Sequence, residues 1–160
     1  MKTLWAPWRM KYLKIVDDNR DECIFCEKPK ERDDRLNLIL FRGKYNFVII
    51  NKYPYNNGHL MVVPYKHTKN PSTLSDKTVV ESWNLLNRCR EILIEAYHPE
   101  GFNIGMNIGR TAGAGIDEHI HTHIVPRWNG DTNFMPVLSK TKVISEGLLD
   151  SYDVLKDLFI

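Results

Sequence analysis

The sequence lacks the features that would assign it at once to a nucleic-acid-binding, membrane or secreted protein. Its formal charge is only +2, from 22 Lys and Arg against 20 Asp and Glu, so the overall balance does not indicate a nucleic-acid partner. No stretch approaches the roughly 18 apolar residues that cross a bilayer. The opening MKTLWAPWRMKYL contains Pro7, Arg9 and Lys11, unlike the apolar run of a secretion signal. We therefore expect a cytoplasmic protein with no membrane and no nucleic-acid partner.

Cysteine is also scarce. Two of the three cysteines form the tight spacing Cys23-Ile-Phe-Cys26, which is a poor disulfide framework and a reasonable pair of metal ligands in a reducing compartment. Two ligands leave two unnamed, so a pair of reduced cysteines at a turn remains the alternative. Cys89 falls within a helical pattern and is expected to be a small core residue.

What the sequence does contain is a series of short β-prone segments around one long helical pattern. Strands are expected over residues 35–41, 45–51, 59–64, 102–108 and 119–126, because these segments are apolar or alternating and are bounded by turn residues. A helix is expected to begin after Ser75 and to end at His98-Pro99, and a weaker helical pattern starts at Ser145. The order β-β-β-α-β-β predicts an α+β fold, with the long helix on one face of an antiparallel meander and a C-terminal helix.

The domain organisation follows from length and composition. With 160 residues and 42% hydrophobic content, the chain suits one well-buried core and is short for two domains. We expect a single domain over residues 1–160. It divides into an N-terminal extension over 1–34 that carries the cysteine pair, a core over 35–128 and a tail over 129–160.

Three of the six histidines share one short segment, His119-Ile120-His121-Thr122-His123. Side chains alternate faces along a strand, so these three imidazoles are expected on one side, with neighbours roughly 7 Å apart. A lone histidine is more often a satisfied core or surface residue, but three in register beside a glycine-rich loop indicate a functional site.

Two chemistries suit such a row of histidines. A His-x-His pair on one strand can hold zinc, and the spacing alone does not exclude a catalytic metal. The glycine-rich segment 109–115 and the absence of a nearby carboxylate pair favour an anion instead. A neutral imidazole whose Nδ1–H is held by a carbonyl can attack phosphorus through Nε2. His121 is the expected nucleophile, and His119 and His123 are expected to stabilise the phosphate oxygens.

The histidine segment resembles the His-φ-His-φ-His-φ-φ signature of the histidine-triad (HIT) superfamily, in which φ is apolar and Thr122 is the one departure. Asn51-Lys52-Tyr53-Pro54 and the following segment 58–64, GHLMVVP, are similar to the family's strand-turn-strand element. The resemblance implies a homodimer and a mononucleotide pocket. It also implies transfer of a nucleoside monophosphate through His121, with His59 as a fourth active-site imidazole.

Two further segments relate the chain to one subgroup of the family. Segments 4–10, LWAPWRM, and 126–134, PRWNGDTNF, resemble a bacterial subgroup that includes diadenosine tetraphosphate phosphorylases. Many family members carry a glutamine in the loop before the histidines, whereas the loop here, residues 110–118, has none. Its small residues suit an incoming inorganic phosphate. We expect phosphorolysis or hydrolysis of a diadenosine polyphosphate, with a nucleoside phosphoramidate hydrolase or a nucleotide-binding regulatory module as alternatives.

The ligand contacts expected under this hypothesis involve a few further residues. Asn107 and the backbone of Gly113, Ala114 and Gly115 are expected to hold phosphate oxygens, and Asn51 is expected to contact the ribose.

The resemblance also implies a zinc site. Many bacterial family members with the cysteine pair have a histidine after the third strand, where this chain has His67, and use the first triad histidine, here His119, as the fourth ligand. A closed set of Cys23, Cys26, His67 and His119 would hold a structural zinc that leaves no open position for water.

Overall fold

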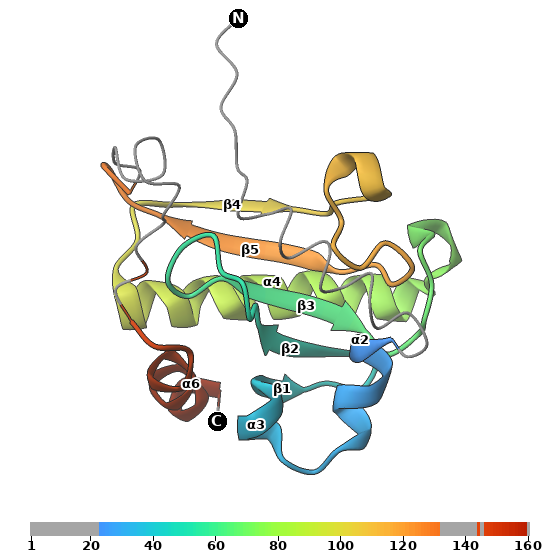
Figure 1. Ribbon diagram of the computed structural model, residues 1–160, viewed down its shortest axis with the longest axis horizontal. Helices are drawn as coiled ribbons and strands as arrows, with labels where there is room; N and C mark the ends of the chain where they lie inside the picture. The colour runs from blue at the N-terminus through green and yellow to red at the C-terminus, as the bar shows by residue number, and fades with distance from the viewer. Residues whose placement is uncertain (1–22, 132–143, 145, 160) are drawn as a thin grey trace, which may run out of the picture.

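The computed structural model describes residues 23–131, 144 and 146–159, and its centre is one five-stranded antiparallel sheet (Figure 1). The strand order is β1-β2-β3-β5-β4. The strands are β1 (Ile39–Arg42), β2 (Asn46–Ile50), β3 (Leu60–Pro64), β4 (Gly101–Gly105) and β5 (Thr122–Arg127). The helices are α2 (Ile24–Glu27), α3 (Asp34–Asn37), α4 (Asp76–Tyr97) and α6 (Leu148–Lys156), with 3₁₀ turns η1 (Lys28–Lys30), η2 (Pro71–Thr73), η3 (Arg110–Ala112) and η4 (Asp157–Phe159). The predicted α+β fold is confirmed.

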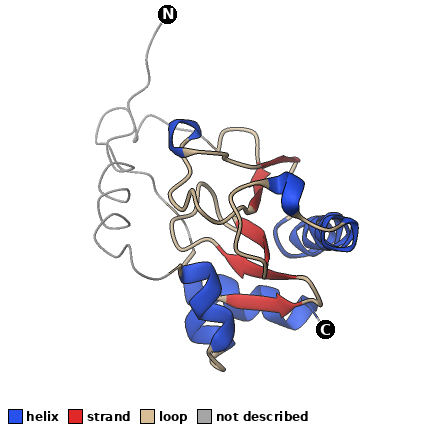
Figure 2. Ribbon diagram, turned by 90° about the vertical axis from the view of Figure 1, so that its right-hand side faces the viewer, coloured by secondary structure: helices blue, strands red, loops and turns tan. Residues whose placement is uncertain are grey.

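The long helix α4 covers one face of the sheet and leaves the other to loops (Figure 2). It begins as predicted, because the Ser75 side chain accepts a hydrogen bond from the Thr78 N–H. It ends at His98, whose left-handed backbone (φ 47°) stops the helix. Cys89 lies in the core at 0% exposure, as expected from its place in the pattern. Within the described ranges, no helix combines the length and apolar character of a membrane span.

Three strand boundaries differ from the sequence prediction by three or more residues. The first strand begins at Ile39 rather than at residue 35, because Asp33 caps the short helix α3 and Leu38 then takes a left-handed backbone (φ 61°). The fourth strand ends at Gly105 rather than at residue 108, since Gly105 and His123 form the last pair of the β4–β5 ladder.

The fifth strand begins at Thr122 rather than at residue 119. The preceding segment is bonded elsewhere: the Ile120 N–H donates to the Thr68 carbonyl at 2.7 Å, and the His119 ring bonds to the Pro64 carbonyl at 2.8 Å. His119 and His121 therefore lie ahead of the strand, and strand alternation does not set their directions.

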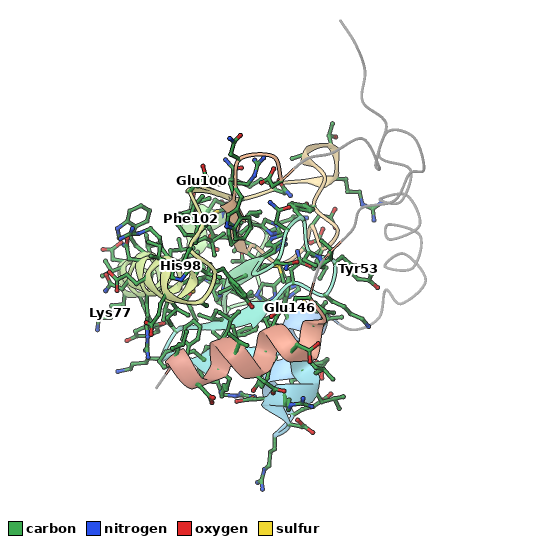
Figure 3. The ribbon with its side chains drawn as sticks, turned by 90° about the vertical axis from the view of Figure 1, so that its left-hand side faces the viewer. Tyr53, Lys77, His98, Glu100, Phe102 and Glu146 are labelled. Carbon is green, nitrogen blue, oxygen red and sulfur yellow. The ribbon has the colours of Figure 1, made fainter. Side chains whose placement is uncertain are left out.

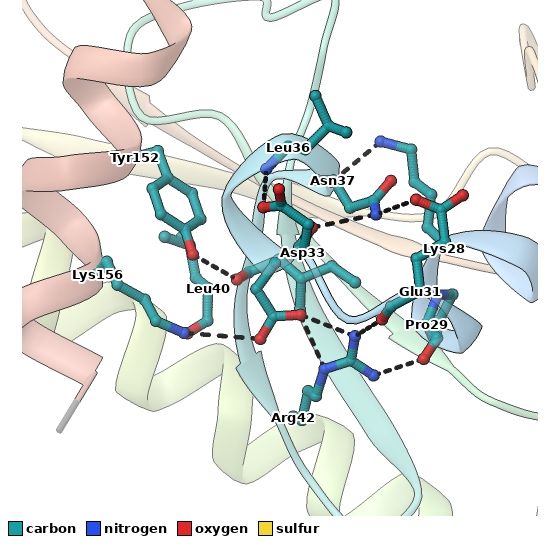
Figure 4. Close-up of polar contacts among 12 residues, drawn as sticks. Lys28, Pro29, Glu31, Asp33, Leu36, Asn37, Leu40, Arg42, Tyr152 and Lys156 are labelled. Carbon is teal, nitrogen blue, oxygen red and sulfur yellow. Dashed lines mark hydrogen bonds and ion pairs between the residues drawn. The ribbon is translucent and has the colours of Figure 1, made fainter.

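The edge of the sheet at β1 is covered by α6 and by the N-terminal helices (Figure 4). The Tyr152 hydroxyl donates to the Ile39 carbonyl at 3.2 Å, and the Lys156 ammonium donates to the Leu40 carbonyl at 2.9 Å. Arg42 donates to the Asp34 carboxylate and to the Pro29 carbonyl. These bonds tie the segment after the cysteine pair to the sheet.

The C-terminal helix also reaches the end of α4. Figure 3 looks along α4, with His98 at its end and Glu146 ahead of α6. The Tyr97 hydroxyl donates to the Glu146 carboxylate at 2.6 Å, and Ser151 donates to the same oxygen. Burial and this carboxylate raise the pKa of Tyr97.

The turn between β1 and β2 is held by a single carboxylate on α4. Glu81 accepts hydrogen bonds from the backbone N–H groups of Lys44, Tyr45 and Asn46 at 2.7–2.8 Å, and from the Asn46 side chain. Burial would raise the pKa of Glu81, but the hydrogen bonds from Asn46, Tyr45 and Lys44 lower it below its ordinary value of 4.5.

We expect Glu81→Gln to lower the free energy of unfolding at pH 7 by about 1–3 kcal/mol. The NH₂ group of glutamine would replace one carboxylate oxygen and could not accept hydrogen bonds from the backbone N–H groups of the turn. A depressed carboxyl pKa stabilises the fold above the unfolded-state pKa, and this stabilisation is lost as pH falls through the folded value. The difference should therefore shrink in acid. Urea unfolding at pH 7 and pH 3 measures it, with Glu91→Gln, exposed on the same helix, as control. An equal difference at both pH values would contradict the role given to the charge.

Candidate active site and metal centre

Three histidines lie in one continuous group where β3 and β5 meet. The His59 Nε2 and His123 Nδ1 atoms are 2.9 Å apart, and the ring centroids of His121 and His123 are 4.8 Å apart. His59 is fully buried and His121 is 6% exposed. Tyr53, from the loop after β2, lies on the opposite side of the sheet from Lys77 of α4 (Figure 3).

The His121 ring is held in one orientation. Its Nδ1 atom lies 2.8 Å from the His119 carbonyl oxygen, and since a carbonyl only accepts, Nδ1 carries the proton. The lone pair is then on Nε2, as expected of a nucleophilic imidazole. Burial lowers the pKa of His121 below its ordinary value, while the bond to the His119 carbonyl opposes the shift. The neutral ring is thus favoured near pH 7.

A chain of hydrogen bonds sets the protonation of His59 and His123. The Tyr55 backbone N–H donates to His59 Nδ1 at 3.0 Å, so the His59 proton is on Nε2 and is donated to His123 Nδ1. A neutral His123 then carries its proton on Nε2, as a donor suited to a phosphate oxygen. Asn51 lies beside this chain, with its Nδ2 atom 3.4 Å from both nitrogens of His59.

His119 points to a different place from His121. Its Nε2–H donates to the Pro64 carbonyl at 2.8 Å, and its Nδ1 atom lies 3.3 Å from Cys23 Sγ and 3.6 Å from Cys26 Sγ. Burial lowers the pKa of His119 to about 4. The structure therefore brings His119 to the cysteine pair, and the His119 backbone, rather than its ring, contacts His121.

Four side chains meet here with the donor set of a metal site. Cys26 Sγ is 3.4 Å from His67 Nδ1, and the ligand atoms of Cys23, Cys26, His67 and His119 all lie within 4.8 Å of one another. Tetrahedral bonds of about 2.3 Å to sulfur and 2.0 Å to nitrogen separate such atoms by roughly 3.5 Å. Burial and the neighbouring Cys23 raise the pKa of Cys26 to about 11, so a pair of thiolates needs a cation here. The cluster fits a metal ion.

Beyond His123, the sheet face opposite α4 has a hollow of about 400 Å³. It runs along β4 and β5 and is closed at the side by the loop after β2. The hollow is lined by Tyr55, Asn56, Asn103, Ile104, Gly105, Met106, Asn107, His123, Val125, Arg127 and Asp131. Asn107, expected to contact phosphate, is therefore a lining residue of this hollow.

In the glycine-rich loop, two of the backbone N–H groups expected to hold phosphate take part in bonds within the loop. The Gly113 N–H donates to the Arg110 carbonyl at 2.8 Å, and the Ala114 N–H approaches the Gly109 carbonyl at 3.5 Å. Ala114 is 3% exposed. A phosphate would have to compete with these two bonds for the Gly113 and Ala114 N–H groups. Neither bond involves Gly115, the third residue predicted to contact phosphate.

Sequence reasoning missed Phe25, Tyr55 and Gly105. Phe25 contacts the rings of both His119 and His121, with centroids 5.5 Å and 4.9 Å away, and its place inside the Cys-Ile-Phe-Cys motif was a signal. Tyr55 bonds to His59 through its backbone, which no residue-type pattern reveals. Gly105 faces His123 across the sheet, and only the register shows this.

Comparisons with known proteins agree with this geometry. The HIT domain family model matches residues 35–130. A protein named AP-4-A phosphorylase from Mycobacterium tuberculosis is 37% identical over 158 residues, covering 94% of this chain and 80% of that protein. A hypothetical histidine triad nucleotide-binding protein from Sulfolobus tokodaii superposes with a TM-score of 0.66 at 26% identity, over 86% and 89% of the two chains.

A Zn-bound histidine triad family protein from Mycobacterium smegmatis has the same fold, with a TM-score of 0.62 at 22% identity over 94% of both chains. The strand order, the histidine group and the family match define the class together. The chain belongs to the HIT family.

We expect His119 and His121 to be opposite tautomers, although they are two residues apart. The Pro64 carbonyl accepts a hydrogen bond from His119 Nε2, and the His119 carbonyl accepts one from His121 Nδ1. Long-range ¹⁵N–¹H spectra of labelled protein at pH 7 distinguish the two forms, with exposed His98 as a reference. An Nε2 proton on His121 would remove the basis for its nucleophilic role.

Proposed function

We propose that this chain cleaves diadenosine polyphosphates, such as diadenosine tetraphosphate, through a nucleotidyl-histidine intermediate on His121. The observation that carries the proposal is the Nδ1 bond of His121 to the His119 carbonyl, which directs the Nε2 lone pair away from its own backbone. The 37% identity to a protein named AP-4-A phosphorylase supports the substrate class.

The proposed reaction has two displacements at the same phosphorus. His121 Nε2 forms a bond to the α-phosphorus of diadenosine tetraphosphate while the bond to the bridging oxygen breaks, and ATP leaves with that electron pair. An oxygen of inorganic phosphate then attacks the adenylyl-histidine and releases ADP. Water in the same position releases AMP. The first step replaces a P–O bond with the P–N bond of the adenylyl-histidine. In the second step the P–N bond breaks as the new P–O bond forms, its electron pair returns to His121 Nε2, and the proton of the attacking phosphate or water passes to solvent.

Other residues supply binding and charge stabilisation in this proposal. His123, with its proton set by His59, donates to the phosphate oxygens as charge develops. Asn51 contacts the ribose of the transferred nucleotide. Asn107, Gly115 and, where their loop bonds open, Gly113 and Ala114 hold phosphate oxygens. His119 acts through its carbonyl on the orientation of His121.

We expect His121→Ala to reduce kcat on diadenosine tetraphosphate by at least about 10³-fold, because no other described ring is oriented to attack. Mass spectrometry of wild-type protein quenched during turnover should find one adenylyl group on His121. The exposed His98→Ala variant is the matched control. ADP plus ATP formed only with phosphate indicates a phosphorylase, and AMP plus ATP without it indicates a hydrolase.

Three results would contradict this proposal. Full activity of the His121 variant would remove the nucleophile. Cleavage of adenosine 5′-phosphoramidate alone would point to a phosphoramidate hydrolase. Nucleotide binding without any product would point to a regulatory module.

We also propose that the cysteine–histidine cluster holds a structural zinc ion. Four ligands leave no open position, so the ion would fix the N-terminal segment and His119 without activating water. The bond from His119 Nε2 to Pro64 is the partner that a zinc-ligating histidine needs. The thiols must stay reduced to bind zinc, so the proposal places the protein in the cytoplasm.

We expect elemental analysis to find one zinc ion per chain, and Cys23→Ser combined with Cys26→Ser to lose it. The double variant should melt at a lower temperature, because metal binding adds to folding free energy. Cys89→Ser, outside the cluster, should retain the metal. Full zinc content or unchanged melting of the double variant would exclude the site.

A homodimer completes the proposal. Among the described strands, β4 is an edge strand, and the apolar Ile104 within it and Met106 and Ile108 just after it are 44–55% exposed. A second copy is the partner that an open edge with apolar neighbours suits.

A further inference from the structure

Strand β4 begins with Gly101 and ends with Gly105, and neither residue offers a side chain to pack. A Cβ placed on either residue meets no heavy atom within 4 Å. Neither has a positive φ, so the backbone does not require glycine at either position. The two positions differ in one respect: Gly105 lines the hollow beyond His123, and Gly101 does not.

The pairing of β4 with β5 places the bare Gly105 position directly beside the site. Gly105 pairs with His123, and paired residues of an antiparallel ladder share a face. A side chain at Gly105 would therefore project next to the His123 ring. The absence of one keeps the hollow continuous with the histidine group.

The hollow has the size and lining of a nucleoside site. It extends along β5 from His123 to Arg127, which is four residue steps or roughly 13 Å at 3.3 Å per step. Its volume is about 400 Å³. Tyr55, stacked on His123 with centroids 6.0 Å apart, and the apolar Met106 and Val125 offer surfaces for a base.

The far end of the hollow is polar but close to electrically neutral. Arg127 donates to both Asp131 oxygens and to the Asn103 side-chain oxygen, and Asn56 donates to Asp131 at 2.8 Å. Hydrogen bonding to Arg127 lowers the pKa of Asp131, so the carboxylate stays charged and balances the guanidinium. Such an end suits the hydroxyl and amino groups of a nucleoside better than the charge of a phosphate.

The order of the strands indicates on which side of the histidine group each half of the substrate would lie. Asn51, at the end of β2, lies on one side of the histidine group, and Gly105 of β4 lies on the other. Phe25 packs against the His121 ring on the side of the cysteine cluster. With the transferred nucleotide at Asn51, the hollow at β4 is the space left for the leaving group.

We propose that this hollow binds the second, leaving nucleoside of a dinucleoside polyphosphate and that Gly105 is the specificity-determining residue that keeps it open. The inference rests on the proposed function and deepens it. A side chain at Gly105 excludes the second nucleoside, while a substrate whose leaving group is small still reaches His121.

The test compares Gly105→Val with Gly101→Val in the full chain. Both changes add the same side chain to the same strand at a position with open space. We expect Gly105→Val to lower kcat/KM for diadenosine tetraphosphate by about tenfold or more, mainly through KM, since binding of the leaving nucleoside is lost. The kcat/KM for adenosine 5′-phosphoramidate, which has no second nucleoside, should stay within about twofold of wild type.

Gly101→Val, which adds its side chain beside Arg127 at the far end of the hollow, should lose less than Gly105→Val on the dinucleotide and should match wild type on the phosphoramidate. Gly105→Ala should give a smaller loss on the dinucleotide alone. Melting temperature and size-exclusion volume check that fold and assembly are kept. An equal loss on both substrates, or no loss on either, overturns the role of Gly105. A wild-type protein that cleaves only the phosphoramidate overturns the substrate class, and one that cleaves neither overturns the proposed function itself.

Discussion

The arrangement of the site depends on His119, which is fully buried and bonded in three directions. Its Nε2–H donates to the Pro64 carbonyl at the end of β3, its Nδ1 atom faces both cysteines, and its own carbonyl accepts from His121. The segment from His119 to His121 has no ladder partner, because β5 starts at Thr122. Side-chain bonds therefore replace sheet pairing in fixing the His121 ring.

The cysteine loop contributes directly to this arrangement. Phe25 lies between Cys23 and Cys26 in the sequence and is 2% exposed. Its ring contacts both His119 and His121. Folding the loop around the cluster thus packs an aromatic ring against the His121 imidazole. The cluster lies away from His121 Nε2 yet determines what surrounds that ring.

Much of the fold was predictable because local chemistry and tertiary structure agree. Ser75 caps α4 and His98 ends it, as the sequence pattern indicated. The strand order along the chain was also read correctly. The left-handed Leu38 was not predicted, since leucine rarely adopts this backbone conformation and its side chain gives no turn signal. The tautomer chain from Tyr55 to His123 and the open space at Gly105 depend on strand register and loop path, which one sequence does not encode locally.

The two edges of the sheet are not equivalent, and this bears on how far copies of the chain can assemble. Tyr152 and Lys156 occupy the carbonyls of Ile39 and Leu40 on β1, whereas β4 ends the sheet on the other side. If two copies paired through β4, as proposed for the homodimer, the pair would have a capped β1 edge at each outer end. Growth by strand addition would then stop at a closed pair, unlike the extended fibres that sheets with two uncovered edges can form.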